Sequence, residues 1–206
     1  MPNVIEVVEQ VKNDLPTRNV EGAIKLAREL IDKLEINTYP VPIIDILNEL
    51  NINTYISEMP SPNISGFIII DKDKETDETN KVVSVNKNDA YARQRFTYAH
   101  EFGHFLFDYG NNNLNHYFDT YNLIKTDKKE ESVPSRFAAE FLMPSKMFEK
   151  RYKDLVNNRY SEEYIINKLA SEFEVGRKAV LKRLQELQLF HENEVCLNYV
   201  SQQTTL

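Results

Sequence analysis

The chain has 206 residues, of which 41% are hydrophobic and 28% are charged, and this composition suits one globular domain with at most a small appendage. Its single cysteine, Cys196, excludes an internal disulfide and a cysteine-based metal cluster. The formal net charge of −7 argues against an overall electrostatic footprint for nucleic acid.

The first fifty residues carry apolar side chains at helical spacing. Two helices are expected between Val4 and Leu34, interrupted by Pro16 and Gly22, and a third is expected after Pro42, because proline is tolerated in a first turn. The N-terminal stretch has acidic residues inside this pattern and no small-residue cleavage site, so it does not resemble a signal peptide. No apolar run approaches the roughly 18 residues that span a bilayer. We therefore expect a cytoplasmic protein with no membrane association.

Three short β-type runs follow at residues 53–59, 64–71 and 81–86, separated by polar, turn-rich segments. They predict a small three-stranded sheet whose last two strands form a hairpin. A long helix is then expected, capped by Asn88 or Asp89 and running to about Phe107. The connector after it, 108–130, has a length typical of lids, binding loops or disordered segments.

Helical spacing returns at residues 132–155 and again at 161–190, where the pattern resembles a helix-turn-helix with its turn at Val175 and Gly176. The second helix of this pair is basic, as helices that read a DNA groove often are, through Arg177, Lys178, Lys182 and Arg183. Because the whole chain is acidic, we favour a helical hairpin packed on the rest of the protein with a solvated basic face. DNA binding is kept as the less favoured alternative.

The chemistry is concentrated in HEFGH, within the stretch RQRFTYAHEFGHFLFDY at residues 93–109. Residues four apart share one face of a helix, so His100 and His104 can both direct a ring nitrogen at one zinc ion. Glu101 projects about 100° away, where it can act as general base for a water molecule on the metal. A lone histidine on an apolar helix is more often a core residue, but this pair with its glutamate favours a catalytic zinc site. Gly103 costs about 1 kcal/mol in mid-helix and indicates a close approach to the backbone.

A catalytic zinc ion needs three protein ligands and an open position. The residues after His104, FLFDYGNNN, lack the closely spaced third histidine of the metzincin pattern. His116 lies in the long connector, and the remaining candidates are the acids Glu130, Glu131 and Glu140.

The blocks RFTYAHEFGHFLF and EESVPSRFAAEFLMP together resemble the ImmA/IrrE family of metallo-endopeptidases, and a looser similarity extends over residues 41–190. The resemblance implies a gluzincin-like site that holds one Zn²⁺ ion, with a glutamate as third ligand. Alignment on residues 137–140 places that ligand at Glu131. Glu140, nine residues later, points to the opposite face of a straight helix, so we expect it to support the site from outside the ligand set or to be structural.

The chain departs from the family pattern at Pro134, where the family has alanine, and at Ser135, where it has Asn or Asp. Proline is tolerated in a first turn, so we expect the helix to start at Ser132 as N-cap, with Glu131 just before it and Glu130 as a rival ligand. Ser135 occupies a position from which a carboxylate or amide often orients a ligating histidine. Serine is a shorter and uncharged partner, so we expect it to weaken zinc affinity relative to the family pattern.

A hydrolase also needs a hydrogen-bond donor for the oxyanion. The candidates by proximity in sequence are Tyr98, Tyr109, His116 and Tyr117. We expect each of them to be a packing or loop residue rather than a catalytic one.

The expected fold class is α+β: a mostly helical, zincin-like domain at residues 1–155 with a three-stranded sheet, and a helix-turn-helix-like subdomain with a tail at 156–206. The family resemblance implies an endopeptidase whose protein substrate is a helix-turn-helix repressor of a phage or mobile element. The alternative is a non-catalytic zinc protein that acts by binding, as an antirepressor or a toxin–antitoxin component. An intact Glu101 argues against this alternative, whereas Pro134 and Ser135 leave it open.

Overall fold

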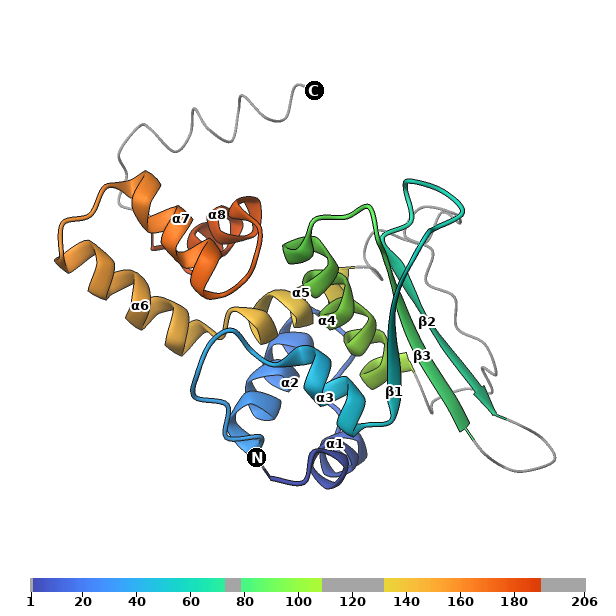
Figure 1. The fold of residues 1–206 in the computed structure, drawn as a ribbon. Helices are drawn as coiled ribbons and strands as arrows, with labels where there is room; N and C mark the ends of the chain where they lie inside the picture. Colours follow the sequence, from blue (N-terminus) through green and yellow to red (C-terminus); the bar gives the residue numbers. More distant parts are fainter. Residues whose placement is uncertain (1, 73–78, 109–131, 190–206) are drawn as a thin grey trace.

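The computed structural model of the chain describes residues 2–72, 79–108 and 132–189. These residues form helices around one small mixed sheet, which is the expected α+β architecture (Figure 1). In chain order the elements are α1 (Val4–Asn13), α2 (Val20–Lys33), α3 (Ile43–Glu49), β1 (Ile52–Ser57), β2 (Gly66–Lys72), β3 (Thr79–Asn86), α4 (Tyr91–Asp108), α5 (Ser132–Leu142), α6 (Ser145–Asn157), α7 (Glu162–Glu172) and α8 (Arg177–Glu186). Among the described residues, no helix combines the length and the apolar character needed to span a membrane.

Both N-terminal helices begin at an asparagine whose side chain caps the first turn. The Asn19 side chain accepts a hydrogen bond from the backbone N–H of Gly22 at 2.8 Å, so Gly22 lies inside the first turn of α2. The prediction that Gly22 interrupts the helical pattern is therefore wrong. A Cβ atom at this position would lie 2.0 Å from the carbonyl oxygen of Thr17, so the chain needs glycine there because the preceding turn approaches its backbone.

The sheet has the strand order β1-β3-β2. β2 and β3 pair antiparallel, which confirms the predicted hairpin, and β1 pairs with β3 in parallel. Alternate side chains of the hairpin are buried on one face, among them Ile68, Ile70, Val83 and Val85. This apolar face packs against α4.

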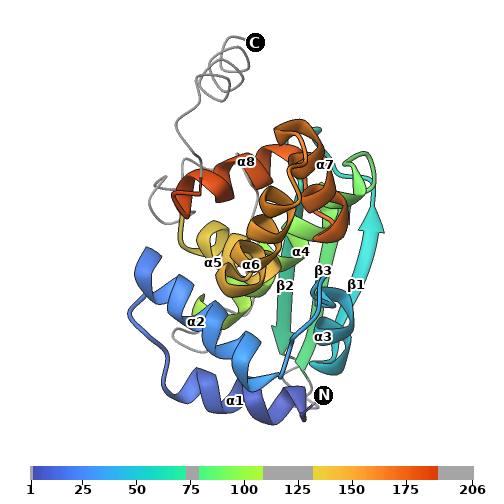
Figure 2. The same ribbon diagram turned by 90° about the vertical axis from the view of Figure 1, so that its left-hand side faces the viewer.

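Helices are stacked behind that face in successive layers: α4 lies on the sheet, α5 packs on α4, and α2 packs on α5 (Figures 1 and 2). Phe102 of α4 contacts Phe137 and Phe141 of α5, with ring centroids 5.6 and 5.7 Å apart. All three rings are fully buried. Burying a phenylalanine side chain contributes about 1.5–3 kcal/mol, so this cluster, which includes Phe102 of HEFGH itself, holds α4 and α5 together at the motif.

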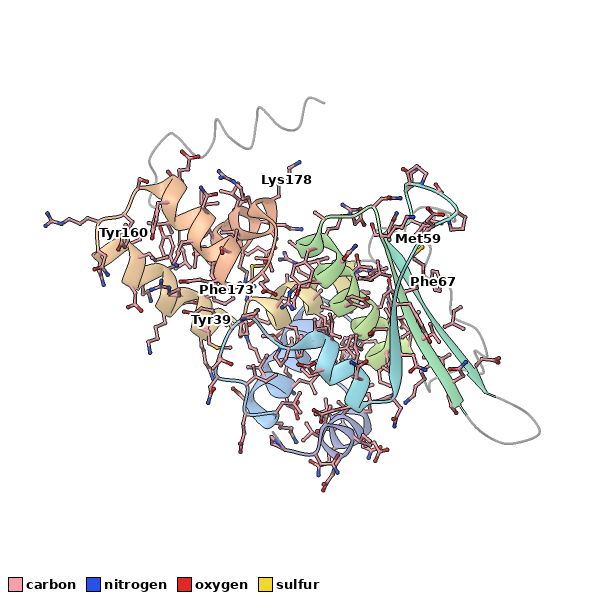
Figure 3. The ribbon with its side chains drawn as sticks, in the orientation of Figure 1. Tyr39, Met59, Phe67, Tyr160, Phe173 and Lys178 are labelled. Atoms are coloured by element: carbon pink, nitrogen blue, oxygen red, sulfur yellow. The ribbon has the colours of Figure 1, made fainter. Side chains whose placement is uncertain are left out.

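The last three helices continue the same core. α6 leads away from the sheet, and α7 and α8 fold back as a hairpin over the ends of α4 and α5 (Figure 1). Phe173, at the end of α7, stacks on Tyr39 with ring centroids 4.3 Å apart (Figure 3). The expected division between residues 155 and 156 falls inside α6, and one hydrophobic core runs across it.

Candidate metal centre

The two histidines of HEFGH converge on one point. His100 and His104 are 3% and 1% exposed, and their Nε2 atoms lie 3.2 Å apart. Two nitrogens that each lie about 2.0–2.1 Å from a tetrahedral ion are separated by roughly 3.3 Å. The i, i+4 spacing on α4 therefore delivers a pair of ring nitrogens spaced for a single zinc ion.

The other ring nitrogen of His104 is held by a carboxylate. Nδ1 of His104 lies 2.8 Å from Oδ2 of Asp108, one turn further along α4. Burial alone would raise the pKa of Asp108, but hydrogen bonds with His104 and Arg18 hold that pKa below its usual value. The ionised carboxylate can only accept, so Nδ1 donates and Nε2 presents its lone pair to the metal position.

Asp108 was missed in the sequence because it was assigned to the connector after the helix. A signal for it existed: it follows His104 by four residues, the spacing that places two side chains on one helical face. Carboxylates commonly orient metal-ligating histidines in this way.

His100 is held from a different helix. The Oγ atom of Ser135, in the first turn of α5, lies 3.2 Å from Nδ1 of His100, within hydrogen-bonding distance. The position aligned with the Asn or Asp of the family therefore does face the histidine ring here. Both histidines have a polar partner at Nδ1, as metal-ligating histidines usually do.

Glu101 lies on the same turn of α4 as His100 and is 3% exposed. A glutamate that directly follows the first histidine of such a pair is the residue type expected to act as general base. The two ring nitrogens, which lie 3.2 Å apart, are donors of the kind that zinc binds.

The close approach that Gly103 indicated comes from Pro134. A Cβ atom at Gly103 would lie 3.1 Å from both Cα and Cβ of Pro134 and 3.2 Å from a ring carbon of Phe137. Pro134 is in the first turn of the described part of α5, where its missing N–H group removes no helical hydrogen bond. The helix therefore tolerates proline at position 134, where the family has alanine. Pro134 packs against Gly103, so α5 crosses α4 at the HEFGH motif.

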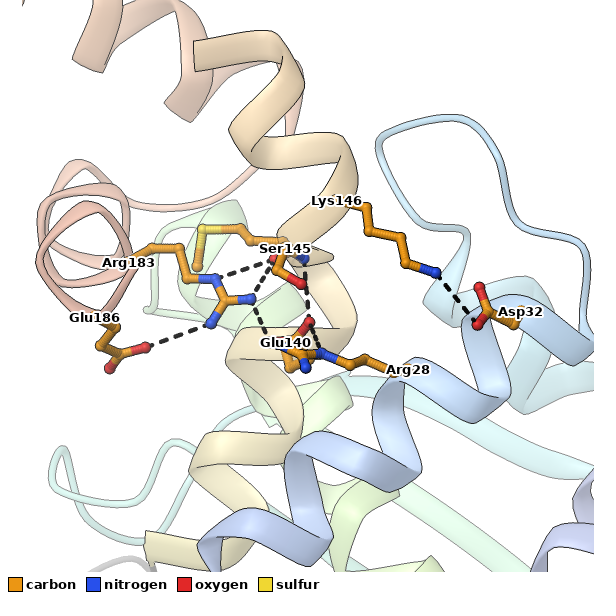
Figure 4. Close-up of polar contacts among 8 residues, drawn as sticks. Arg28, Asp32, Glu140, Ser145, Lys146, Arg183 and Glu186 are labelled. Carbon is orange, nitrogen blue, oxygen red and sulfur yellow. Dashed lines mark hydrogen bonds and ion pairs between the residues drawn. The ribbon is translucent and has the colours of Figure 1, made fainter. Parts of the chain in front are cut away.

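Glu140 makes its contacts away from the histidines. Its Oε1 atom accepts from Nε of Arg28 at 3.0 Å and from the backbone N–H of Ser145 at 3.1 Å, and its Oε2 atom pairs with Arg183 (Figure 4). Of the two roles left open for Glu140, these contacts favour the structural one. Arg183 is 4% exposed in this network, so its assignment to a solvated basic face of α8 is wrong.

Several candidates lie outside the described residues: Tyr109, His116, Tyr117, Glu130 and Glu131. Within residues 2–72, 79–108 and 132–189, no group of three His, Cys, Asp or Glu side chains is placed to hold a metal. Glu131 as third ligand therefore stays a prediction. Of the oxyanion candidates, Tyr98 is described, and its hydroxyl donates to the carbonyl oxygen of Tyr55 at 3.0 Å.

Three comparisons with known proteins show what the chain is similar to. The model of the IrrE N-terminal-like domain, peptidase family M78, matches residues 47–185. No curated protein matches the chain. Among solved structures, the chain is similar to a Mycobacterium tuberculosis transcriptional regulator, with a TM-score of 0.49 and 14% identity over 94% of this chain and 54% of that one. The chain thus spans about half the length of that regulator. Because the family match covers more than half of the chain, including all of α4 and α5, the chain belongs to the family of the IrrE N-terminal-like domain, peptidase family M78.

Proposed function

We propose that the protein is a zinc-dependent endopeptidase that cleaves a protein substrate. The observation that carries this proposal is the 3.2 Å separation of the two Nε2 atoms, on the helix that also carries the buried Glu101. His100 and His104 would hold the ion, with Glu131 as the third ligand. When bound, zinc supplies Lewis acidity for the water nucleophile and the scissile carbonyl.

The protein's own residues account for the remaining steps. Glu101 takes a proton from the attacking water molecule while the oxygen of that water forms a bond to the carbonyl carbon. The carbon–nitrogen bond then breaks, and Glu101 returns the proton to the leaving amine, so the products are one carboxylic acid and one amine. Asp108 and Ser135 keep the two imidazole rings oriented throughout, through their contacts with Nδ1.

The substrate we propose is a helix-turn-helix transcriptional repressor of a phage or mobile element, cleaved in the cytoplasm, and the family resemblance supports this choice. A substrate segment could bind as an added strand along an edge of the sheet. β1 is one such edge, and it exposes the side chains of Tyr55 and Ile56.

The test uses purified wild type and the isosteric variant Glu101→Gln, with helix-turn-helix repressors of phages or mobile elements from the same genome as substrates. We expect wild type to bind about one zinc ion per chain and to cleave. Glu101→Gln should retain zinc and lose roughly 10²–10⁴-fold in rate, the usual contribution of a general base. Equal cleavage by both forms, or no zinc in wild type, would contradict the proposal.

A second candidate is a zinc protein that inactivates the repressor by binding alone. It is favoured by Ser135, a shorter partner for His100 than the Asn or Asp that the family has at this position. Under this candidate, wild type and Glu101→Gln relieve repression equally and the repressor stays intact. DNA binding through α8 is less favoured, because Arg183 is buried and cannot contact DNA. Lys178 and Lys182 remain exposed on that helix.

A further inference from the structure

We propose that Arg18 is a positioning residue of the metal centre. In this proposal Arg18 fixes the carboxylate of Asp108, and Asp108 in turn fixes the ring of His104. Arg18 precedes the segment matched by the family, residues 47–185, so the N-terminal helices contribute to a site that the family segment alone does not complete. The inference rests on the proposed zinc site.

The contact is made across a long stretch of sequence. Arg18 lies between α1 and α2, and Asp108, 90 residues later, is the last residue of α4. Nε of Arg18 donates to Oδ1 at 2.7 Å and Nη2 donates to Oδ2 at 3.2 Å. Two parallel bonds of this kind fix the plane of the carboxylate as well as its position, which a lysine cannot do.

The same carboxylate oxygen serves the histidine. Oδ2 of Asp108 accepts from Nη2 of Arg18 and lies 2.8 Å from Nδ1 of His104. Asp108 is 16% exposed and His104 only 1%, so little solvent competes for the bond between them, whereas the side chain of Arg18 is 35% exposed. An orientation imposed on the carboxylate by Arg18 is therefore passed to the imidazole ring, and through it to Nε2 at the metal position.

Asp108 needs a second residue to hold its carboxylate because it is the last residue of α4. A carboxylate in the last turn of a helix is disfavoured by the helix dipole, and helix ends fray. The positive charge of Arg18 offsets the unfavourable interaction of the Asp108 carboxylate with the helix dipole. The two hydrogen bonds from Arg18 oppose fraying of the last turn. His100 has no such requirement, since Ser135 lies on α5, which packs tightly over Gly103. The two ligand rings are thus held by two different outside elements.

The test compares Arg18→Met with Arg28→Met in the full chain. Arg28 is a matched control because it also comes from the N-terminal helices and pairs with a carboxylate of a site helix, Glu140, at 3.0 Å. Glu140, however, contacts neither histidine. The readouts are the zinc dissociation constant and the zinc release rate by chelator competition, with circular dichroism to verify folding.

Loss of a residue that directly orients a metal-ligating histidine costs about 10–100-fold in metal affinity. Arg18 acts one step further away, so we expect Arg18→Met to weaken zinc binding about 3–10-fold, Arg18→Lys to recover part of the loss, and Arg28→Met to stay within about twofold. Equal weakening by the Arg18 and Arg28 variants, or no weakening by Arg18→Met, would overturn the inference.

A double-mutant cycle separates positioning from general stabilisation. If Arg18 acts through Asp108, Arg18→Met has no further effect on zinc affinity in an Asp108→Ala background. If Arg18→Met weakens zinc binding as much in the Asp108→Ala background as in the wild-type background, the positioning role is contradicted. The proposed function is unaffected by that result as long as the wild-type protein binds zinc. A wild-type protein that binds no zinc contradicts the proposed function itself.

Discussion

Glu140 of α5 and Arg183 of α8 form an ion pair whose side chains are 1% and 4% exposed (Figure 4). Arg183 also donates two hydrogen bonds to the carbonyl oxygen of Met143, at 2.9 and 3.1 Å. The C-terminal hairpin is thereby joined to the helix that carries Ser135. A buried pair of this kind stabilises the fold only while both charges are present.

We therefore expect Arg183→Met to lower the free energy of unfolding by about 3–5 kcal/mol, because it leaves the carboxylate of Glu140 with less compensation. Urea denaturation measures the change. Arg177→Met is the matched control, since Arg177 lies on the same helix and pairs with Glu163 at the surface, where the two side chains are 38% and 77% exposed. That variant should cost less than about 1 kcal/mol. Similar losses in both would contradict the buried-pair account.

The pH dependence of stability should follow from Glu140. Burial alone would raise the pKa of this carboxyl group, but the charge of Arg183 and hydrogen bonds from Arg28, Arg183 and Ser145 hold it below the ordinary 4.5. A carboxyl whose pKa is lower in the folded state contributes stability that is complete above its unfolded pKa and is lost as pH falls toward the folded value. Urea midpoints measured below pH 4.5 should thus fall more steeply in wild type than in Glu140→Gln. Parallel curves would refute the assignment.

Gly103 carries a prediction about the contact of α4 with α5. In Gly103→Ala the new methyl group would lie 3.1 Å from Cα and Cβ of Pro134. Overpacking costs about 1–3 kcal/mol, against a gain in helix propensity of about 1 kcal/mol, so we expect net destabilisation. We also expect weaker zinc binding, because α5 must shift and Ser135 moves with it. Gly176→Ala is the control, since a Cβ atom at Gly176 has no neighbour within 4 Å among the described residues. Gly176 is the N-cap of α8, so alanine there should cost no more than about 1 kcal/mol and leave zinc affinity unchanged.

Much of the site could be predicted from local patterns. The spacing of His100 and His104 places both residues on one helical face. The β-type runs at 64–71 and 81–86, separated by a polar, turn-rich segment, predict the hairpin, because both signals lie in residues close together in the sequence. The contact of Arg18 with Asp108 could not be found in this way, since its members are 90 residues apart and depend on how α1 and α2 pack. The burial of Arg183 was missed for the same reason. A basic residue on an amphipathic helix looks solvated until its partner on another helix is known.

Ser135 should set how tightly zinc is held. Its Oγ atom lies 3.2 Å from Nδ1 of His100, at the long end of hydrogen-bond distances. We expect Ser135→Ala to weaken zinc binding about tenfold and Ser135→Asp to strengthen it, since a carboxylate makes a shorter, charge-assisted bond. The zinc dissociation constant by chelator competition is the measurement. Ser145→Ala is the control, because Ser145 contacts Glu140 through its backbone N–H rather than its side chain. Unchanged affinity in Ser135→Ala would show that His100 is oriented by other groups.

Tyr98 tests whether the oxyanion donor lies on α4. Its hydroxyl donates to the carbonyl oxygen of Tyr55 in β1 at 3.0 Å, and burial raises the pKa of the hydroxyl, so it stays protonated and engaged at neutral pH. A hydroxyl has one proton to donate, and a proton committed to the strand cannot also stabilise a developing oxyanion. We therefore expect Tyr98→Phe to cost about 1 kcal/mol of stability, the usual net value of one hydrogen bond. Its kcat, measured on a protein substrate that wild type is found to cleave, should stay within about threefold of wild type, because loss of a true oxyanion donor costs about 10²–10³-fold. A loss of that larger size with stability unchanged would make Tyr98 catalytic and would require its bond to Tyr55 to break when substrate binds.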